Sequence, residues 1–308
     1  LWLAVPLFWS FGSANALPAI MTHGGTIVLQ ESFEADQALT IIRLQRCTVF
    51  YGMANMVRAL KASSYWSKDA VETMRTGLTI GLPEDVAFII ETLKAHELCN
   101  VYGSTETYGN ATVCDAFDSL EQRLNSQGKP LPGMDVQILD RDTREILPSG
   151  VIGEIAIKGH VTVGYYLEPE MTVSTFHNDF FLSGDLGCLD QDGRLYFKGR
   201  FKEMIKTGGI NVAPLEVEGI LVAHPMIKQA YVVGVFDHVK EEKVVAVVVY
   251  EEGEQESEKD LREFCREELA SYKVPESIIF YQEINLPLTS TGKINKLKLK
   301  DELSMKLD

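Results

Sequence analysis

The sequence is poor in the residues and motifs that mark metal and redox enzymes. Its five cysteines are scattered, odd in number and without a CxxC pair: Cys47, Cys99, Cys114, Cys188 and Cys265. This pattern argues against a disulfide framework and indicates free thiols in a reducing compartment. The six histidines show no metal-ligand spacing, and the motifs HExxH, GxSxG and GxxxxGK[ST] are absent. These absences argue against the zinc proteases, nucleophile-elbow hydrolases and P-loop enzymes that the motifs define.

Positive charge is also scarce. Lysine and arginine total 29 against 44 aspartates and glutamates, which gives a formal net charge of −15 and a pI near 4.9. Such a surface repels nucleic acid at long range, so the charge argues against DNA or RNA as a partner. A nucleotide can still bind where positive charge is concentrated locally.

Long apolar runs are missing as well. The apolar stretch 1–16 lacks a basic leading region and is interrupted by Pro6 and Gly12, so it predicts neither a signal peptide nor a transmembrane helix. We interpret it as a core strand and the start of a helix. There is no initiating methionine, and together with this apolar start that suggests a piece of a longer chain. We expect a cytoplasmic location.

Hydrophobic periodicity and length predict two domains. Short apolar strands alternate with helices over 25–60, and a helix at 83–96 leads into another strand, which is typical of parallel βαβ units. From about residue 130 apolar and polar residues alternate, which predicts antiparallel strands with a hairpin at Asp192-Gly193. Beyond residue 200 we expect helices at 214–223 and 261–269 and strands at 227–236, 243–250 and 277–281. The acidic stretch 251–260 is interpreted as a solvated turn and helix start.

One polar segment, VYGSTETYGN at 101–110, follows an apolar strand. Its small residues allow a backbone to approach a phosphate closely. Glu106 suits a divalent cation, and Tyr102 suits the face of a base. Taken alone, the segment also fits an ordinary loop with two turn glycines.

A second segment, 181–218, concentrates an acid and several cations. Asp185 is expected on a tight loop after a strand, where one carboxylate can accept from both ribose hydroxyls; a simple turn aspartate is the alternative. Arg200 and Lys202 belong to a basic run that also fits a solvated loop. The pair Gly208-Gly209 indicates close backbone approach or a special turn.

The third segment, LPLTSTGKINK, ends the second domain. Lys293 follows a Thr-Ser-Thr-Gly turn that can present its amine at a fixed place. It is followed by Ile294, so it is not a Walker lysine. We interpret the later lysines as surface charges: Lys296, Lys298 and Lys300.

Taken in order, these segments resemble the AMP-forming acyl-CoA synthetases of the adenylate-forming superfamily. The resemblance covers nearly the whole chain and rests on VPLFWSFG, YGSTE, GEIAIKGHVTVGYY, SGDLGCLDQDGRLYFKGR, IKTGGINVAPLEVE and LPLTSTGKINK. It implies an α/β plus α+β fold class. Residues 1–200 would be a truncated large α/β adenylate-forming domain, and residues 201–308 a small mobile α+β domain.

The resemblance also implies site residues. The implied catalytic set is Lys293, Thr105 and Glu106, with Lys293 as the adenylation lysine, Thr105 on phosphate and Glu106 holding Mg²⁺. The implied binding set for ATP and coenzyme A is Tyr102, Gly103, Ser104, Asp185, Arg200, Lys206, Gly208 and Gly209. Within this set, Tyr102 would flank the adenine. Asp185 would bind the ribose hydroxyls, and Arg200 would support the ribose–phosphate side. The loop 206–209 would face the pantetheine arm of coenzyme A. Lys202 would be the hinge.

The sequence departs from the family pattern in two places. A phosphate loop ending in Pro-Lys-Gly is expected before VPLFWSFG and is not in the sequence, so we expect the isolated chain to be inactive. Trp9 stands where many relatives carry histidine. With Phe8 and the stretch 77–81 it would border the acyl pocket, and the acyl substrate stays open.

The implied reaction has two halves. A small carboxylic acid attacks ATP to give acyl-AMP and pyrophosphate, and the thiol of coenzyme A then displaces AMP. Lys293 would neutralise charge in the first half and be withdrawn by rotation about Lys202 in the second. Two alternatives remain: an adenylation module that loads a carrier protein, and a non-catalytic nucleotide-binding relative. The oligomeric state is open, a homo-oligomer included.

Overall fold

The computed structural model describes residues 1–251, 257–289 and 293–307. The chain divides into two compact units, Leu1–Phe197 (unit 1) and Lys198–Asp308 (unit 2), and each is described by itself. The division falls within strand β12 (Leu195–Arg200), which also contains the predicted boundary at residue 200. No helix among the described residues has both the length and the apolar character needed to cross a bilayer.

The first part of unit 1 is a seven-stranded sheet in the order β2-β1-β3-β4-β5-β6-β7. Strands β1 to β5 are parallel, as predicted, and β6 and β7 continue the sheet antiparallel. The strands are β1 (Trp2–Leu3), β2 (Val28–Leu29), β3 (Val49–Tyr51), β4 (Thr76–Thr79), β5 (Glu97–Tyr102), β6 (Thr112–Val113) and β7 (Lys129–Pro130). The helices are α1 (Leu17–Thr22), α2 (Ala35–Leu44), α3 (Ala54–Ala62), α4 (Pro83–Leu93) and α5 (Leu120–Asn125).

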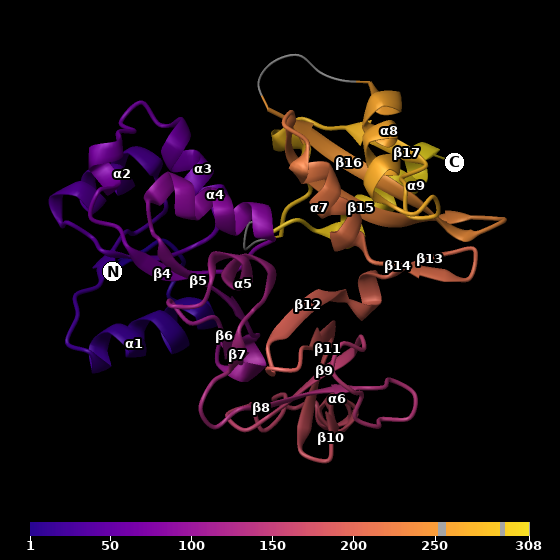
Figure 1. Ribbon diagram of the computed structural model, residues 1–308, viewed down its shortest axis with the longest axis horizontal. Helices are drawn as coiled ribbons and strands as arrows, with labels where there is room; N and C mark the ends of the chain where they lie inside the picture. The colour runs from indigo at the N-terminus through magenta and orange to yellow at the C-terminus, as the bar shows by residue number, and fades with distance from the viewer. Residues whose placement is uncertain (252–256, 290–292, 308) are drawn as a thin grey trace. The chain divides into compact units, whose positions relative to one another are not determined.

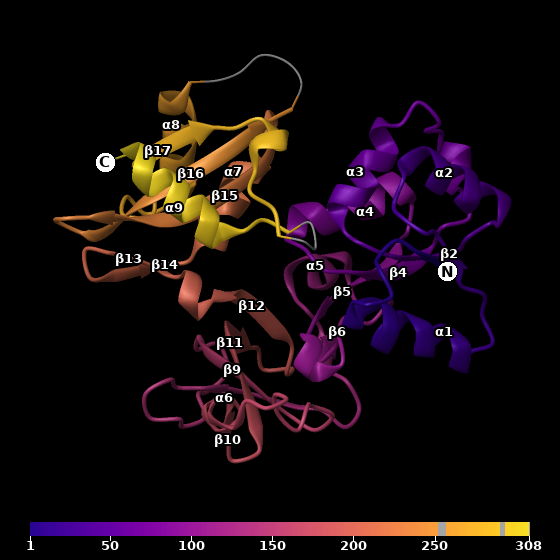
Figure 2. The same ribbon diagram turned by 180° about the vertical axis from the view of Figure 1, so that it is seen from behind.

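Helices cover both faces of this sheet, with α2, α3 and α4 on one face and α1 on the other (Figure 1, and from behind in Figure 2). The alternation of side chains along a strand explains the two cores. Trp2 and Phe50 pack with the α2–α4 side, whereas Leu3 and Tyr51 pack with the α1 side. The predicted helix at 83–96 begins at Pro83 but ends earlier, because Lys94 takes a left-handed conformation.

The second part of unit 1 is an antiparallel sheet in the order β10-β11-β9-β8, with β12 paired to β11. Its elements are β8 (Asp135–Leu139), β9 (Gly153–Lys158), α6 (Pro169–Thr175), β10 (Phe176–His177) and β11 (Phe180–Leu189). The predicted hairpin lies between β11 and β12, with Gly193 at a φ of +76°. A shared core joins this sheet to the end of β5, where Tyr102 packs with Ile155, Phe181 and Leu195.

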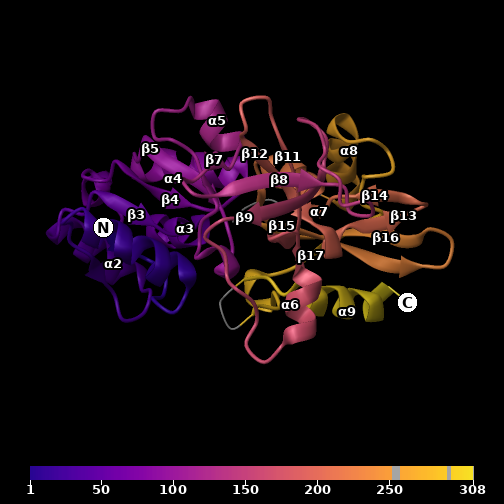
Figure 3. The same ribbon diagram turned by 90° about the horizontal axis from the view of Figure 1, so that it is seen from below.

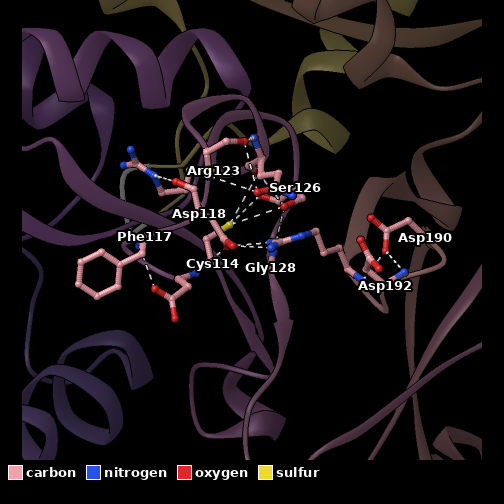
Figure 4. A network of polar contacts seen from close by, with 12 residues as sticks. Cys114, Phe117, Asp118, Arg123, Ser126, Gly128, Asp190 and Asp192 are labelled. Carbon is pink, nitrogen blue, oxygen red and sulfur yellow. Dashed lines mark hydrogen bonds and ion pairs between the residues drawn. The ribbon is translucent and has the colours of Figure 1, made fainter.

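A buried polar network also ties the two sheets of unit 1 together. Arg194, at the β11–β12 turn, forms an ion pair with Asp118, and its Nη1 lies 2.7 Å from the Asp118 Oδ2. Figure 4 shows Asp118 beside Cys114, Arg123 and Ser126. The Cys114 thiol donates to the Ser126 carbonyl, and Arg123 donates to the backbone of β5. The network therefore fixes the segment before α5 against the hairpin that begins β12.

Unit 2 contains one five-stranded sheet in the order β14-β13-β16-β15, with β17 parallel to β16. Its strands are β13 (Ile205–Thr207), β14 (Ile210–Val212), β15 (Ile227–Asp237), β16 (Glu241–Tyr250) and β17 (Ser277–Phe280). Its helices are the short η4 (Phe201–Glu203) and η5 (Glu283–Asn285) with α7 (Pro214–Ala223), α8 (Glu258–Glu268) and α9 (Lys296–Leu307). Part of the predicted acidic turn, 252–256, lies outside the described residues.

The two faces of the unit 2 sheet carry separate cores. Val217 of α7 and Leu261 of α8 pack on one face, and Leu299 and Leu303 of α9 pack on the other. Figure 3 shows α8 and α9 on opposite sides of the strands. Helix α9 is not in the sequence-based prediction, which has only surface lysines there.

Candidate functional site

The segment that follows β5 is a tight, internally bonded loop. Ala111 donates to the Tyr102 carbonyl at 2.7 Å and Gly109 donates to the Ser104 carbonyl at 2.8 Å. Between them the short helix η3 (Thr105–Thr107) leads to Tyr108, which is left-handed at a φ of +53°. A Cβ on Gly103 would lie 2.3 Å from the Gly109 carbonyl oxygen. Glycine is therefore required for this loop to close.

Tyr102 and Asp185 meet at the base of the loop. The Tyr102 hydroxyl donates to Asp185 Oδ2 at 2.8 Å, although the two residues lie 83 positions apart. Both are only 7% exposed. The Tyr102 ring packs against Phe197 with the ring centroids 5.8 Å apart. The structure thus joins two residues that the sequence selected independently for base and ribose binding.

The sequence predicts Asp185 on a tight loop after a strand, and the structure differs. Asp185 lies inside β11, where the pairing with β9 shifts register between Leu182 and Leu186. Gly184 has a φ of +71°, and Ser183 donates to the Ile155 carbonyl at 2.7 Å and accepts from the Asp185 backbone at 3.1 Å. A bulge of this kind re-aims a side chain while the strand continues on both sides.

Glu106 is oriented by the connection that follows β9 in unit 1. The Tyr165 hydroxyl donates to Glu106 Oε1 at 2.9 Å, and the Thr162 backbone donates to the Glu106 carbonyl at 2.7 Å. Burial, followed by the hydrogen bond and charge of Glu106, raises the pKa of Tyr165 to about 12. Tyr165 therefore stays a neutral donor, and its hydrogen bond fixes the orientation of the Glu106 side chain. The sequence analysis does not assign Tyr165 a role, although it lies in the GHVTVGYY segment.

Two buried polar atoms of the loop have no hydrogen-bond partner among the described residues: Ser104 Oγ and Asn110 Oδ1. Buried polar groups are nearly always paired, so such atoms are expected to bond to a ligand or water. Asn110 has no role in the sequence-based prediction, where the only signal is its place at the end of the VYGSTETYGN segment. Thr105, by contrast, is exposed.

The described residues contain no group of three or more histidine, cysteine, aspartate or glutamate side chains arranged to hold a metal ion. Mg²⁺ commonly takes only one or two protein carboxylates, with phosphates and water as its other ligands. The single oriented carboxylate of Glu106 fits that mode of binding.

In unit 2, Lys293 lies close enough to Arg200 for their charges to interact. Desolvation, and then repulsion by Arg200, lowers the pKa of the Lys293 ammonium. Its side chain is nevertheless exposed by surface area. Thr289 donates to the Lys293 carbonyl at 2.7 Å, and Leu288 and Ile294 form an antiparallel bridge that closes the loop. The rest of the predicted Thr-Ser-Thr-Gly turn, 290–292, lies outside the described residues.

The predicted special turn at Gly208-Gly209 is present. It connects β13 to β14, with φ of +57° at Gly208 and +77° at Gly209, so both glycines adopt a conformation that other residues disfavour. Apart from the flanking residues, no heavy atom of the described chain lies within 4 Å of where either Cβ would be. Lys206, on β13, is exposed and donates its backbone N–H to Glu242 at 2.8 Å.

One prediction about the lysines is wrong. Lys296, expected as a surface charge, has a side chain only 16% exposed. Its Nζ lies 2.8 Å from Glu218 Oε1 and 3.2 Å from Glu203 Oε2. Lys300 also forms an ion pair, with Glu242, but remains more exposed. Lys298 is exposed, as expected.

The residues expected near the acyl pocket lie in two parts of unit 1. Phe8 is 80% exposed and Trp9 is half-buried, just before η1 (Phe11–Ala16). The stretch 77–81 includes the end of β4 and the Gly81 carbonyl, which accepts from Asn100 at 3.2 Å. Their role at a pocket stays a prediction.

Two family models match the chain. The AMP-binding enzyme model matches residues 1–167, and the AMP-binding enzyme C-terminal domain model matches residues 216–293. Among curated proteins, the mitochondrial medium-chain acyl-CoA ligase of Rattus norvegicus is 32% identical over 311 residues. That match covers 99% of this chain and 50% of the relative, so the chain spans about half the length of the curated relatives it matches.

Solved structures agree in fold. ATP-bound MatB from Rhodopseudomonas palustris aligns with a TM-score of 0.89 at 29% identity, covering 100% of this chain and 61% of that one. The o-succinylbenzoate CoA synthetase of Bacillus subtilis, in complex with its acyl-adenylate intermediate, aligns with a TM-score of 0.82 at 30% identity, covering 97% and 60%. The predicted α/β plus α+β adenylate-forming fold is confirmed.

Proposed function

Because this chain belongs to the AMP-binding enzyme family, we propose that the natural polypeptide activates a carboxylic acid with ATP to acyl-AMP and transfers the acyl group to coenzyme A. The observation that carries the proposal is the buried hydrogen bond between Tyr102 and Asp185. The bond holds the Asp185 carboxylate, which would suit the two hydroxyls of a ribose, at the foot of a glycine-containing loop that would suit phosphate. The same class of reaction is supported by similar proteins, which are named as an acyl-CoA ligase and a CoA synthetase.

Unit 1 supplies the groups proposed to bind the nucleotide. Asp185 would accept from the ribose hydroxyls, and Tyr102 would border the adenine while its hydroxyl holds Asp185 in place. Gly103 lets the loop fold tightly, and Ser104 and Thr105 offer hydroxyls to phosphate or base. The buried, unpartnered Ser104 Oγ supports a ligand on this side of the loop.

Glu106 is the proposed magnesium ligand. Its carboxylate is oriented by Tyr165, and Mg²⁺ bound there would neutralise charge on the pyrophosphate. The contribution of this chain is to hold the carboxyl group in a fixed orientation. The neutral Tyr165 hydroxyl performs that task without adding a competing positive charge.

Lys293 is proposed to act in the first half-reaction. A carboxylate oxygen of the acid bonds to the α-phosphorus of ATP, the bond from that phosphorus to the bridging oxygen breaks, and pyrophosphate leaves. Negative charge on the reacting oxygens would be neutralised by the Lys293 ammonium, with Arg200 on the ribose–phosphate side.

In the second half-reaction the thiolate of coenzyme A would attack the acyl carbonyl, and AMP would leave as the carbon–oxygen bond breaks. The thiol proton is released to solvent. Lys206, Gly208 and Gly209 are proposed to serve the pantetheine arm. The open turn at the two glycines supports this role, since a backbone without side chains can lie against an extended ligand. Rotation about Lys202 is proposed to exchange the arrangement in which Lys293 serves the first half-reaction for the one in which 206–209 serves the second.

The test is acid-dependent exchange between ATP and pyrophosphate in the natural polypeptide. We would assay a panel of straight-chain and aromatic acids, beginning with octanoate because a relative is named a medium-chain ligase. Exchange with at least one acid, followed by thioester formation on adding coenzyme A, is expected. ATP binding without exchange for any acid would favour the nucleotide-binding relative, and transfer only to a carrier pantetheine would favour the carrier-loading module. A cytoplasmic location also stays a proposal, checked by cell fractionation.

A further inference from the structure

Lys296 is buried in an arrangement that helix stability alone does not explain. It is the first residue of α9, and no acidic residue lies in the first turn of that helix. A cation at a helix N-terminus is opposed by the helix dipole. Something outside the helix must therefore hold the ammonium in this position.

Two carboxylates from distant parts of the sequence hold it. Glu218, in the middle of α7, is 5% exposed and lies 2.8 Å from the Lys296 Nζ; Glu203, at the end of η4, lies at 3.2 Å. Desolvation alone would lower the pKa of Lys296, but the two carboxylates outweigh it and the pKa is raised. The ammonium thus stays charged at neutral pH.

Glu218 is in turn fixed to the sheet. Its Oε1 accepts from the Val232 backbone of β15 at 2.7 Å, and Val232 lies opposite Ala246 of β16. The same oxygen therefore receives both a backbone N–H and the Lys296 ammonium. This anchors the start of α9 to the core of unit 2 at one point.

Lys296, Glu218 and Glu203 form a triad, and two of its members, Glu203 and Lys296, border the two segments that matter for the proposed mechanism. Glu203 directly follows the proposed hinge residue, Lys202. Lys296 follows Lys293 closely along the chain, and between them Asn295 donates to the Pro287 carbonyl at 2.7 Å. One ammonium therefore connects the end of the hinge to the end of the lysine loop.

We propose that Lys296 is a positioning residue, which ties the Lys293 loop and the segment after the hinge to the same core so that they move as one body. This inference rests on the proposed role of Lys293 in adenylation. It predicts that the triad sets where the Lys293 amine lies, and also that the pivot is confined to residues before Glu203.

The test is Lys296→Met in the natural polypeptide, with the two half-reactions measured separately. We expect kcat of ATP–pyrophosphate exchange to fall about 10–100-fold, with KM for ATP changed less than about twofold, because a small misplacement of a catalytic group is costly. Thioester formation from supplied acyl-AMP should stay within about threefold. Lys296→Arg should recover most of the exchange. Equal losses in both half-reactions, or no loss, would overturn the inference.

Lys300→Met is the matched control, since Lys300 is on the same helix and also in an ion pair, with Glu242. It should leave both half-reactions unchanged. Glu203→Gln tests the hinge side with little risk to folding, because Glu203 is 35% exposed and its change spares Glu218. We expect about a 3–10-fold loss of ATP–pyrophosphate exchange. A loss confined to thioester formation would contradict the proposed positioning role of Lys296.

Hydrogen exchange gives a readout that does not depend on activity. In Lys296→Met the amide of Asn295 should exchange faster than in the wild type, while amides of β15 and β16 stay protected. Unchanged protection at Asn295 would overturn the positioning role. If the wild type catalysed no ATP–pyrophosphate exchange with any acid, the proposed function would fail. The amide hydrogen exchange of Asn295 would still decide whether Lys296 holds the loop.

Discussion

At the scale of single residues, Lys293 is where the proposed chemistry can be separated from folding. Its side chain is exposed and its loop is closed by backbone contacts, so replacing it should not disturb the core. We expect Lys293→Ala in the natural polypeptide to lower acyl-AMP formation by about 10²–10³, the usual cost of removing one preorganised charge-stabilising group. Pyrophosphate exchange measures this step.

The same variant should still convert supplied acyl-AMP and coenzyme A to thioester at nearly the wild-type rate. Lys293→Arg is the control, because it keeps the charge but not the compact shape of the ammonium, and we expect it to recover only part of the activity. If both half-reactions fell together, Lys293 would not be specific to adenylation.

Functional residues can be identified from the sequence when the neighbouring residues in the chain already indicate their role. Asp185, Glu106 and Lys293 can be selected because each stands out from its immediate neighbours. Lys296 cannot, since its burial depends on Glu218 and Glu203, which the fold brings to it from far earlier in the chain. Without those partners a lysine near the end of a polypeptide is correctly expected in solvent.

At the scale of elements, local periodicity predicts most of the fold but not its irregular points. Helix α7 matches its predicted range, and the parallel strands follow from short apolar runs between helices. Helix α9 is missed because lysine and leucine alternate at its start, and only Leu299 and Leu303 reveal the helical spacing. The bulge that carries Asp185 is missed because register depends on the partner strand, β9.

The link between the two sheets of unit 1 should be a major source of its stability. Asp118 and Arg194 are 12% and 8% exposed and pair through two hydrogen bonds. Replacing Arg194 with methionine would leave a largely buried carboxylate without its cation. We expect a loss of about 3 kcal/mol in the free energy of unfolding at pH 7. Urea denaturation followed by tryptophan fluorescence reports on unit 1 alone, since Trp2, Trp9 and Trp66 all lie there.

The loss of unfolding free energy caused by Arg194→Met should become smaller as the pH falls. The hydrogen bond from Arg194 lowers the pKa of Asp118 in the folded protein. A lowered carboxyl pKa contributes stability above the unfolded value of about 3.9, and that contribution disappears as pH falls through the folded value. The difference between wild type and Arg194→Met should therefore shrink below about pH 4.

Arg75→Met is the matched control for this experiment. Arg75 also pairs with a carboxylate, Glu97, but the two side chains are 63% and 41% exposed. An exposed pair of this kind contributes about 0–1 kcal/mol. A loss from Arg75→Met as large as that from Arg194→Met would show that burial is not the cause. A loss from Arg194→Met that persists unchanged at low pH would contradict the linkage to Asp118.

At the scale of the whole molecule, the two units supply different parts of the proposed reaction. Unit 1 contains the hydroxyl–carboxylate pair and the glycine loop, while unit 2 contains Lys293, Arg200 and the open glycine turn. The residues of each set can be predicted from sequence because each of them lies in a recognisable local motif, although the motifs themselves are far apart in the chain. The acyl substrate cannot, since an apolar lining is compatible with many acids.

The last prediction concerns the chain of 308 residues taken alone. It carries no phosphate loop ending in Pro-Lys-Gly, and it spans about half the length of the curated relatives. We therefore expect it to release no pyrophosphate steadily from ATP with Mg²⁺ and any acid of the panel. A coupled pyrophosphate assay measures this, with the natural polypeptide as the positive control and its Lys293→Ala variant as the background. Nucleotide should still bind weakly to the 308-residue chain, because Tyr102, Asp185 and Glu106 are all oriented within unit 1. Asp185→Asn should weaken that binding, which calorimetry with AMP would detect. Steady turnover by the short chain would mean that the charges of units 1 and 2 suffice for catalysis without any further loop.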